Sequence, residues 1–271
     1  MDGALFSVIA GFQLAGASLG VCELAPEKRP AALAEYHELA NNCLSLPPWP
    51  LDFDADLERS FLFRINEERR SAGLPELQLR RQLRAPARFH SLDQIWHEEL
   101  SHDGIGGRTA SDRVGTMDRT LVSNSLQENV GMVGSGNTAD GLIDRLHQAF
   151  MASDYHRDNI LSKTATHMAV GVAVGEDSWY VTQLFAGMVG ELPNPLALKI
   201  DATQNLPSTV SLTGWRFVGF NVRREEISLP IELGQAGEAE LTLIGNRPHS
   251  NNEELVYVIE LRGPIIDLQK K

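Results

Sequence analysis

The chain has 271 residues, of which 42% are hydrophobic, so it is long enough to bury a large core and is not disordered. Its formal net charge is -12 and its Lys and Arg residues form no basic block, which excludes a nucleic-acid partner. Two cysteines, Cys22 and Cys43, allow at most one disulfide, which excludes a disulfide-stapled scaffold and leaves the redox compartment open.

The N-terminal segment has two interpretations. Residues 5–17 are apolar enough for the core of a signal peptide but short for a membrane span. The residues before them carry no Lys or Arg, and residues 19–22 only loosely resemble a lipoprotein cleavage site because Val21 is large. A signal or anchor and an ordinary buried helix remain alternatives, and we predict no transmembrane span.

Apolar residues at helical spacing predict helices over the next part of the chain. The first covers residues 30–46, an amphipathic helix follows from about residue 55 to Gly73, and further helices cover about 81–99 and begin near Thr138. Gly and polar residues dominate 103–118, which predicts a loop or very short elements there.

The strands come after the helices. Residues 168–174 and 179–185 are rich in β-forming residues and predict a β-hairpin. Helices before strands, without βαβ alternation, indicate an α+β fold rather than a doubly wound sheet. From about residue 196 short strands alternate with turn residues, as in a small all-β, sandwich-like domain. The predicted organisation is an N-terminal segment at 1–51, a domain at 52–190 and a β-rich accessory domain at 191–271.

The stretch WHEELSH, residues 96–102, places two histidines five positions apart. A zinc peptidase helix has its histidines four apart, because that spacing leaves both side chains on one face. Five positions turn His97 and His102 about 140° from each other on an unbroken helix, so one metal ion cannot take both. This excludes the peptidase motif and places His102 where the helix should end.

Six motifs resemble one protein family and follow that family's order. They are LFRINEERRSAGLPELQL (62–79), ARFHSLDQ (87–94), SHDG (101–104), QENVG (127–131), SDYHRDNIL (153–161) and MAVGVAVGEDSWYVTQLF (168–185). The chain resembles a bacterial member of the CAP superfamily, also called SCP-like, which includes cysteine-rich secretory proteins, venom allergens and plant pathogenesis-related proteins. The resemblance covers residues 55–188, about half of the chain.

The resemblance implies a CAP-type α-β-α sandwich outside the cytoplasm, with a cleft lined by two histidines and acidic residues. It assigns His102 to the first cleft histidine, Glu128 to the glutamate of the family's Gly-Glu-Asn motif and His156 to the second histidine. Ser153 stands where many members have a second glutamate, so the resemblance does not extend to an activity that needs the complete set.

The same three residues also form an adequate set of metal ligands. Two imidazoles and one carboxylate, from His102, His156 and Glu128, could hold a divalent ion such as zinc and leave a position open for water. They could equally form a structural hydrogen-bonded cluster. We interpret His90 as a buried histidine hydrogen-bonded inside the fold, and Arg113 as held by an acidic partner.

The residues do not point to a nucleophile. Ser91 lies next to His90, but adjacent helical residues point about 100° apart, and no nucleophile elbow surrounds Ser153. The leading hypothesis is therefore a noncatalytic binding module at the cell envelope or outside the cell, with a small-molecule, lipid or cell-envelope ligand. The alternatives are a metal-dependent, peptidase-like hydrolase that uses the two cleft histidines with Glu128, and a structural adhesion module.

Overall fold

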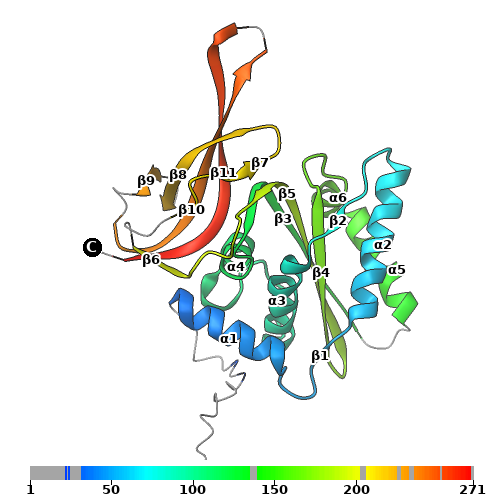
Figure 1. Cartoon of the computed structure of the whole chain (residues 1–271). Helices are drawn as coiled ribbons and strands as arrows, with labels where there is room; N and C mark the ends of the chain where they lie inside the picture. Colours follow the sequence, from blue (N-terminus) through cyan, green and yellow to red (C-terminus); the bar gives the residue numbers. More distant parts are fainter. Residues whose placement is uncertain are drawn as a thin grey trace, which may run out of the picture.

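The computed structural model describes residues 22, 24, 32–134, 139–201, 206–224, 227–231, 235–250 and 252–269 (Figure 1). The predicted signal or anchor at residues 1–22 lies outside these residues, apart from Cys22. None of the described helices is both long and apolar enough to cross a membrane. The helices are α1 (Leu33–Ser45), α2 (Ala55–Ser71), α3 (Arg84–His97), α4 (Ala110–Met117), α5 (Ala139–Ala152) and α6 (Asp154–Ile160).

The strands join one mixed sheet in the order β1-β4-β5-β3-β11-β10-β8-β9. The predicted hairpin is present as β4 and β5, which pair antiparallel, and β3 pairs antiparallel with β5 along its whole length. The strands are β1 (Asp52–Phe53), β2 (Gln78–Leu79), β3 (Leu121–Gly134), β4 (His167–Val174), β5 (Ser178–Glu191), β6 (Lys199–Asp201), β7 (Ser211–Leu212), β8 (Arg216–Arg224), β9 (Ile227–Pro230), β10 (Gly237–His249) and β11 (Asn252–Gln269).

Helices cover both faces of the N-terminal half of the sheet, with α1, α3 and α4 on one side and α2, α5 and α6 on the other (Figure 1). Strand β4 shows why both faces are covered, because its side chains alternate between two cores. The side chains at its even positions, Met168, Val170 and Val172, pack with α2, α5 and α6. Those at its odd positions, Ala169 and Ala173, pack with α1 and α3. This confirms the predicted α+β fold, an α-β-α sandwich followed by a β-rich region.

Each helix is positioned by a local signal and a close contact. Helix α2 begins at the N-cap Asp54, whose carboxylate accepts hydrogen bonds from two backbone N–H groups, and it is followed by Gly73 at a positive φ of 69°. Helix α3 lies so close to β4 that a Cβ at Gly171 would come within 2.2 Å of the backbone nitrogen of Arg88. Gly171 therefore sets the distance between α3 and the sheet.

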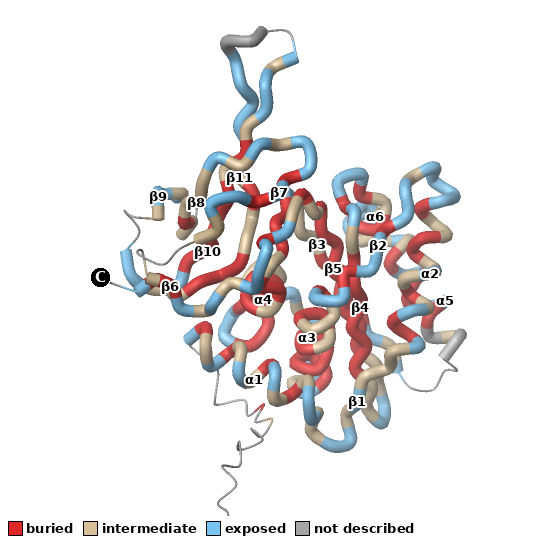
Figure 2. The backbone as a smooth tube through the Cα atoms, viewed as in Figure 1, coloured by how far each residue is buried: buried red, intermediate tan, exposed pale blue. Residues whose placement is uncertain are grey.

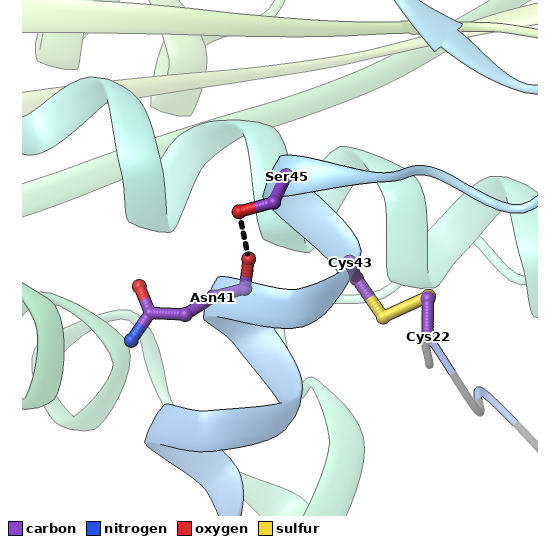
Figure 3. Close-up of a disulfide and its surroundings, with 4 residues drawn as sticks. All are labelled: Cys22, Asn41, Cys43 and Ser45. Carbon is purple, nitrogen blue, oxygen red and sulfur yellow. Dashed lines mark hydrogen bonds between the residues drawn. A yellow bond between two sulfur atoms is a disulfide. The ribbon is translucent and has the colours of Figure 1, made fainter. Parts of the chain in front are cut away.

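Helix α1 is held to the domain by its apolar face and by a disulfide. Tyr36, Ala40 and Cys43 are fully buried, and the Tyr36 ring packs edge-to-face on Phe89 of α3 at 5.4 Å. Cys43 forms a disulfide with Cys22 (Figure 3), so the chain N-terminal to α1 is fixed at the last turn of this helix.

The C-terminal part continues the same sheet. Strand β11 pairs with β10 in a long hairpin and also with β3, through Arg262 and Ser123 (Figure 1). The end of this hairpin projects from the molecule and is exposed (Figure 2). Arg119, just after α4, is buried and donates hydrogen bonds to four carbonyl oxygens, among them those of Leu196 and Ile265. One guanidinium thus joins the two parts of the chain.

Two elements differ from the sequence prediction. Residues 103–118 contain a two-turn helix, α4, which begins with a capping box between Thr109 and Asp112. The region around Glu128, for which the sequence predicted no helix or strand, is the 14-residue strand β3. Both elements carry side chains of the candidate site.

Candidate functional site

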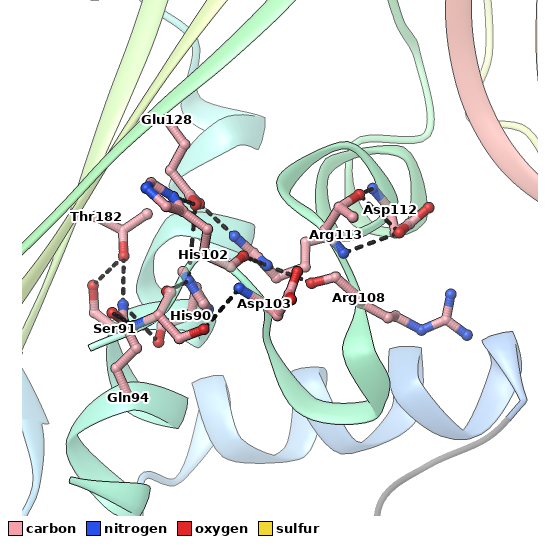
Figure 4. A network of polar contacts seen from close by, with 12 residues as sticks. His90, Ser91, Gln94, His102, Asp103, Arg108, Asp112, Arg113, Glu128 and Thr182 are labelled. Atoms are coloured by element: carbon pink, nitrogen blue, oxygen red, sulfur yellow. Dashed lines mark hydrogen bonds and ion pairs between the residues drawn. The ribbon is translucent and has the colours of Figure 1, made fainter. Parts of the chain in front are cut away.

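Glu128 is the centre of the candidate site. It lies in the middle of β3 opposite Leu184 of β5, so its position is fixed by the sheet. Its side chain is 4% exposed. One carboxylate oxygen, Oε1, accepts a hydrogen bond from Nδ1 of His102 at 2.9 Å, and the other, Oε2, accepts from Arg113 (Figure 4). The structure thus joins two of the three predicted site residues directly.

Arg113 on α4 holds this part of the site together. Its side chain is 1% exposed, and a buried guanidinium must be paired to offset its loss of hydration. Besides its ion pair with Glu128, Nη1 donates to the carbonyl oxygens of His102 at 2.9 Å and of Arg108 at 2.6 Å (Figure 4). The predicted acidic partner of Arg113 is therefore Glu128 itself, which makes Arg113 a residue of the site that sequence reasoning did not recognise.

Charge pairing fixes the protonation states of Glu128 and His102. Burial alone would raise the pKa of Glu128, but the hydrogen bond from His102 and the charge of Arg113 outweigh burial and lower it. The hydrogen bond to Glu128 in turn raises the pKa of His102. Because an ionised carboxylate only accepts, Nδ1 of His102 carries a proton. The imidazole is half exposed, with its Nδ1 held by Glu128.

His156, the third predicted residue, lies in the short helix α6. Its ring packs edge-to-face with Phe150 at 5.1 Å and with Tyr155 at 5.8 Å between centroids. The Tyr155 ring is also 6.3 Å from that of His102, and the residue is 61% exposed. Burial and the charge of His102 lower the pKa of His156. An exposed tyrosine therefore stands next to both histidines.

Two buried asparagines connect α6 to β3. The amide of Asn129 donates to the carbonyl oxygen of His156 at 3.2 Å. The amide of Asn159 donates to the carbonyl oxygen of Glu128 at 3.1 Å and to Oδ1 of Asn129 at 2.8 Å. The backbones that carry His156 and Glu128 are thus positioned by one network of amides.

The structure confirms the interpretation of His90 as a histidine that is buried and hydrogen-bonded inside the fold. It is fully buried, and Nε2 donates to the carbonyl oxygen of Ser101 at 2.9 Å. Burial and the charge of Arg113 lower its pKa to about 3, so the imidazole is neutral. Its Nε2 lies 3.9 Å from Oε1 of Glu128, which places this neutral ring directly beneath the Glu128–His102 pair.

The serines considered as nucleophiles take other positions. The Ser91 hydroxyl is buried and donates to the carbonyl oxygen of Gly171 at 3.0 Å, with Oγ1 of Thr182 at 2.9 Å, so it joins α3 to the sheet. Ser153 is the N-cap residue of α6, without a capping hydrogen bond from its side chain. Neither hydroxyl is bonded to an imidazole among the described contacts.

Two structural observations bear on the predicted metal site. Within the described ranges, no group of three or more His, Cys, Asp and Glu side chains is arranged to hold a metal ion. Both oxygens of Glu128 are engaged by His102 and Arg113. Direct ligation by Glu128 would have to compete with a buried ion pair. The site at His102, Glu128 and His156 therefore stays a prediction for a metal titration.

Comparisons with known proteins match part of this chain to a protein family. The model of the CAP, or cysteine-rich secretory protein, family matches residues 62–185. No curated protein shows a significant match to the chain. A similar solved structure is that of an extracellular protein with an SCP domain from Bacillus anthracis, with 25% identity, a TM-score of 0.41 and coverage of 48% of this chain and 40% of that one.

Two further solved structures are similar over about half of this chain. A cysteine-rich secretory protein from Staphylococcus aureus has 23% identity and a TM-score of 0.37, with coverage of 49% of this chain and 38% of that one. An outer surface protein from Borrelia burgdorferi has 15% identity and a TM-score of 0.44, with coverage of 51% and 98%. This chain thus spans less than half of the Bacillus and Staphylococcus proteins. Residues 62–185 match the model of the cysteine-rich secretory protein family, which confirms the resemblance seen in the sequence for this part of the chain.

Proposed function

We propose that this chain is a noncatalytic binding module that acts outside the cytoplasm. In this proposal the CAP domain extends over about 52–190, and the β-rich part at 191–271 tethers it to a partner. The ligand, a small molecule, a lipid or a cell-envelope component, contacts the surface formed by His102, Tyr155 and His156. The observation that carries the proposal is the buried Arg113–Glu128–His102 arrangement.

The state of Glu128 argues against acid-base catalysis. A general base at neutral pH needs a pKa near 7, whereas the pKa of Glu128 is lowered from its ordinary value. Its two oxygens already accept from His102 and Arg113. Glu128 thus acts as a fixed support that orients the His102 imidazole, and His102 presents Nε2 to the ligand. This arrangement supports the proposal of a recognition surface.

The disulfide supports the proposed location. Disulfides persist in oxidising compartments and are rare in the cytosol. The two cysteines of the chain, Cys22 and Cys43, are bonded to each other. Their pairing favours an oxidising, extracytoplasmic site of action, as the family resemblance implies, although the number of cysteines alone had left the redox compartment open.

One observation favours a second function, a metal-dependent hydrolase. A carboxylate that accepts from Nδ1 of a histidine is the usual support of a metal-ligating imidazole, and Glu128 holds His102 in this way. In such an enzyme the residues of this chain would hold an ion that activates water. The lowered pKa of His156 would also favour its neutral, metal-binding form.

A calorimetric zinc titration of the full chain separates the two functions. The wild type is compared with His102→Ala and His156→Ala, and with His37→Ala on α1 as a histidine control away from the site. Thermal melting checks that each variant is folded. The binding module predicts that zinc gives no saturable one-to-one binding that depends on both site histidines. Saturable binding lost in both site variants but kept in His37→Ala would overturn the proposal and favour the hydrolase.

A further inference from the structure

The turn that follows α1 presents a tryptophan to solvent. The backbone N–H of Leu51 donates to the carbonyl oxygen of Pro48 at 2.9 Å, which closes a turn with Trp49 at its tip. Trp49 is 87% exposed, more than any other large hydrophobic residue described, and Leu46 is 67% exposed. We call residues 46–51 the Trp49 turn.

The Trp49 turn is held firmly by the domain. Leu51 packs against the core cluster that contains Ile95 of α3 and Cys43 of α1. A Cβ at Gly175, in the turn between β4 and β5, would meet both Leu51 and Ile95. The base of the turn is therefore anchored on three elements, so Trp49 is displayed by a fixed scaffold.

The sequence around Trp49 is uncharged. Residues 39–51 contain no Asp, Glu, Lys or Arg, although 22% of the whole chain is charged. An indole has an apolar body and one N–H donor, which suits the boundary between hydrocarbon and water. A fixed, uncharged turn with leucine and tryptophan at its surface has the chemistry of a contact with lipid headgroups.

The disulfide fixes Cys22 close to the Trp49 turn. Cys43 lies three residues before Leu46, and its Cα is 4.5 Å from that of Cys22. The apolar residues 5–17 are separated from Cys22 by only four residues in the sequence.

We propose that the Trp49 turn docks on the headgroup region of a lipid bilayer, with the Trp49 indole inserted at the interface. This end of the CAP domain then faces the membrane. The net charge of -12 and the uncharged turn provide no attraction to anionic lipid. The binding is consequently hydrophobic, and it does not increase with the anionic lipid content.

The test measures binding of the full chain to vesicles of phosphatidylcholine, with and without phosphatidylglycerol. Trp49→Ser is compared with Phe63→Ser, which removes another exposed aromatic side chain, 60% exposed on α2. We expect the first variant to bind vesicles about tenfold more weakly, because it loses the burial of one large side chain, and the second to bind like the wild type. Both positions are exposed, so both variants should fold.

Quenching by brominated lipid locates the indole itself. We expect bromine on the acyl chains to quench the fluorescence of the vesicle-bound wild type, and this quenching to be largely lost in Trp49→Phe but kept in Trp215→Phe. Equal quenching in the two variants, or equal vesicle binding by wild type and Trp49→Ser, would overturn the proposal. Self-association without vesicles that is lost in Trp49→Ser would also overturn it, because it would assign the turn to a second copy of the chain.

Discussion

His90 makes stability depend on pH, because its imidazole stays neutral in the fold. Burial lowers its pKa from 6.5 to about 3, so the unfolded state binds the proton more readily and stability falls as the pH falls below the unfolded value. From about pH 7.5 to about pH 5, we expect His90 to remove about 2 kcal/mol from the free energy of unfolding. Urea unfolding of the wild type and of His90→Gln at several pH values in this range measures the loss of stability in each protein. An equal loss in both proteins would contradict the prediction.

Arg113 should be the most sensitive charged residue of the site. Arg113→Met leaves Glu128 buried without its cationic partner, and breaking a buried pair in this way costs roughly 3–5 kcal/mol. Chemical denaturation measures this loss. The matched double variant, Arg113→Met with Glu128→Gln, removes the uncompensated charge and should recover part of it. A single variant as stable as the wild type would show that the ion pair does not support the site.

The site was only partly predictable from the sequence. His102, Glu128 and His156 were named through the family resemblance, and the structure bonds the first two directly. Arg113 was expected to have an acidic partner, but that partner is 15 residues away on another element, and the folded chain alone brings them together. Tyr155 gave no signal because an exposed aromatic residue in a polar stretch has no periodicity that indicates a role.

At the scale of elements, the approach of α3 to β4 depends on one missing side chain. A Cβ at Gly171 would lie 2.3 Å from the carbonyl carbon of Ala87, and backbone atoms cannot move aside cheaply. We expect Gly171→Ala to destabilise the protein by roughly 3 kcal/mol or more, through displacement of α3. Gly219→Ala on β8 is the control, since nothing lies within 4 Å of its added Cβ. The melting temperatures of the two variants should differ widely. Similar melting temperatures would contradict the expected displacement of α3.

The elements that were not predicted from the sequence are those in which buried polar residues interrupt the usual alternation of apolar and polar side chains. Strand β3 is covered on both faces, and it carries buried Ser123, Glu128 and Asn129 among its apolar residues, so the expected alternation is absent. Helix α4 has eight residues, with Gly115 inside and buried Arg113 and Thr116. The elements with clear periodicity, α2, α3 and β4, were predicted close to their observed bounds, whereas β5 continues to Glu191, beyond its predicted end at residue 185.

At the scale of the whole molecule, the disulfide between Cys22 and Cys43 should contribute substantially to stability. It closes a loop with a sequence separation of 21 residues, for which the loss of chain entropy in the unfolded state is about 3 kcal/mol. We expect Cys22→Ser to lower the free energy of unfolding by about this amount in oxidising buffer. In reducing buffer the wild type and the variant should unfold alike. Equal stability of the two proteins in oxidising buffer would contradict the prediction.

Strand β11 has a mechanical consequence for the molecule. Its 18 residues run without interruption from the projecting hairpin, through the pairing with Ser123 of β3, to the pairing with β6. At about 3.3 Å per residue this is a stiff member of about 60 Å. A pull on the tip of the hairpin is therefore carried along one backbone to β3, the strand that holds Glu128. The projecting hairpin and the strand that holds Glu128 are thus connected through one pairing, that of Arg262 with Ser123.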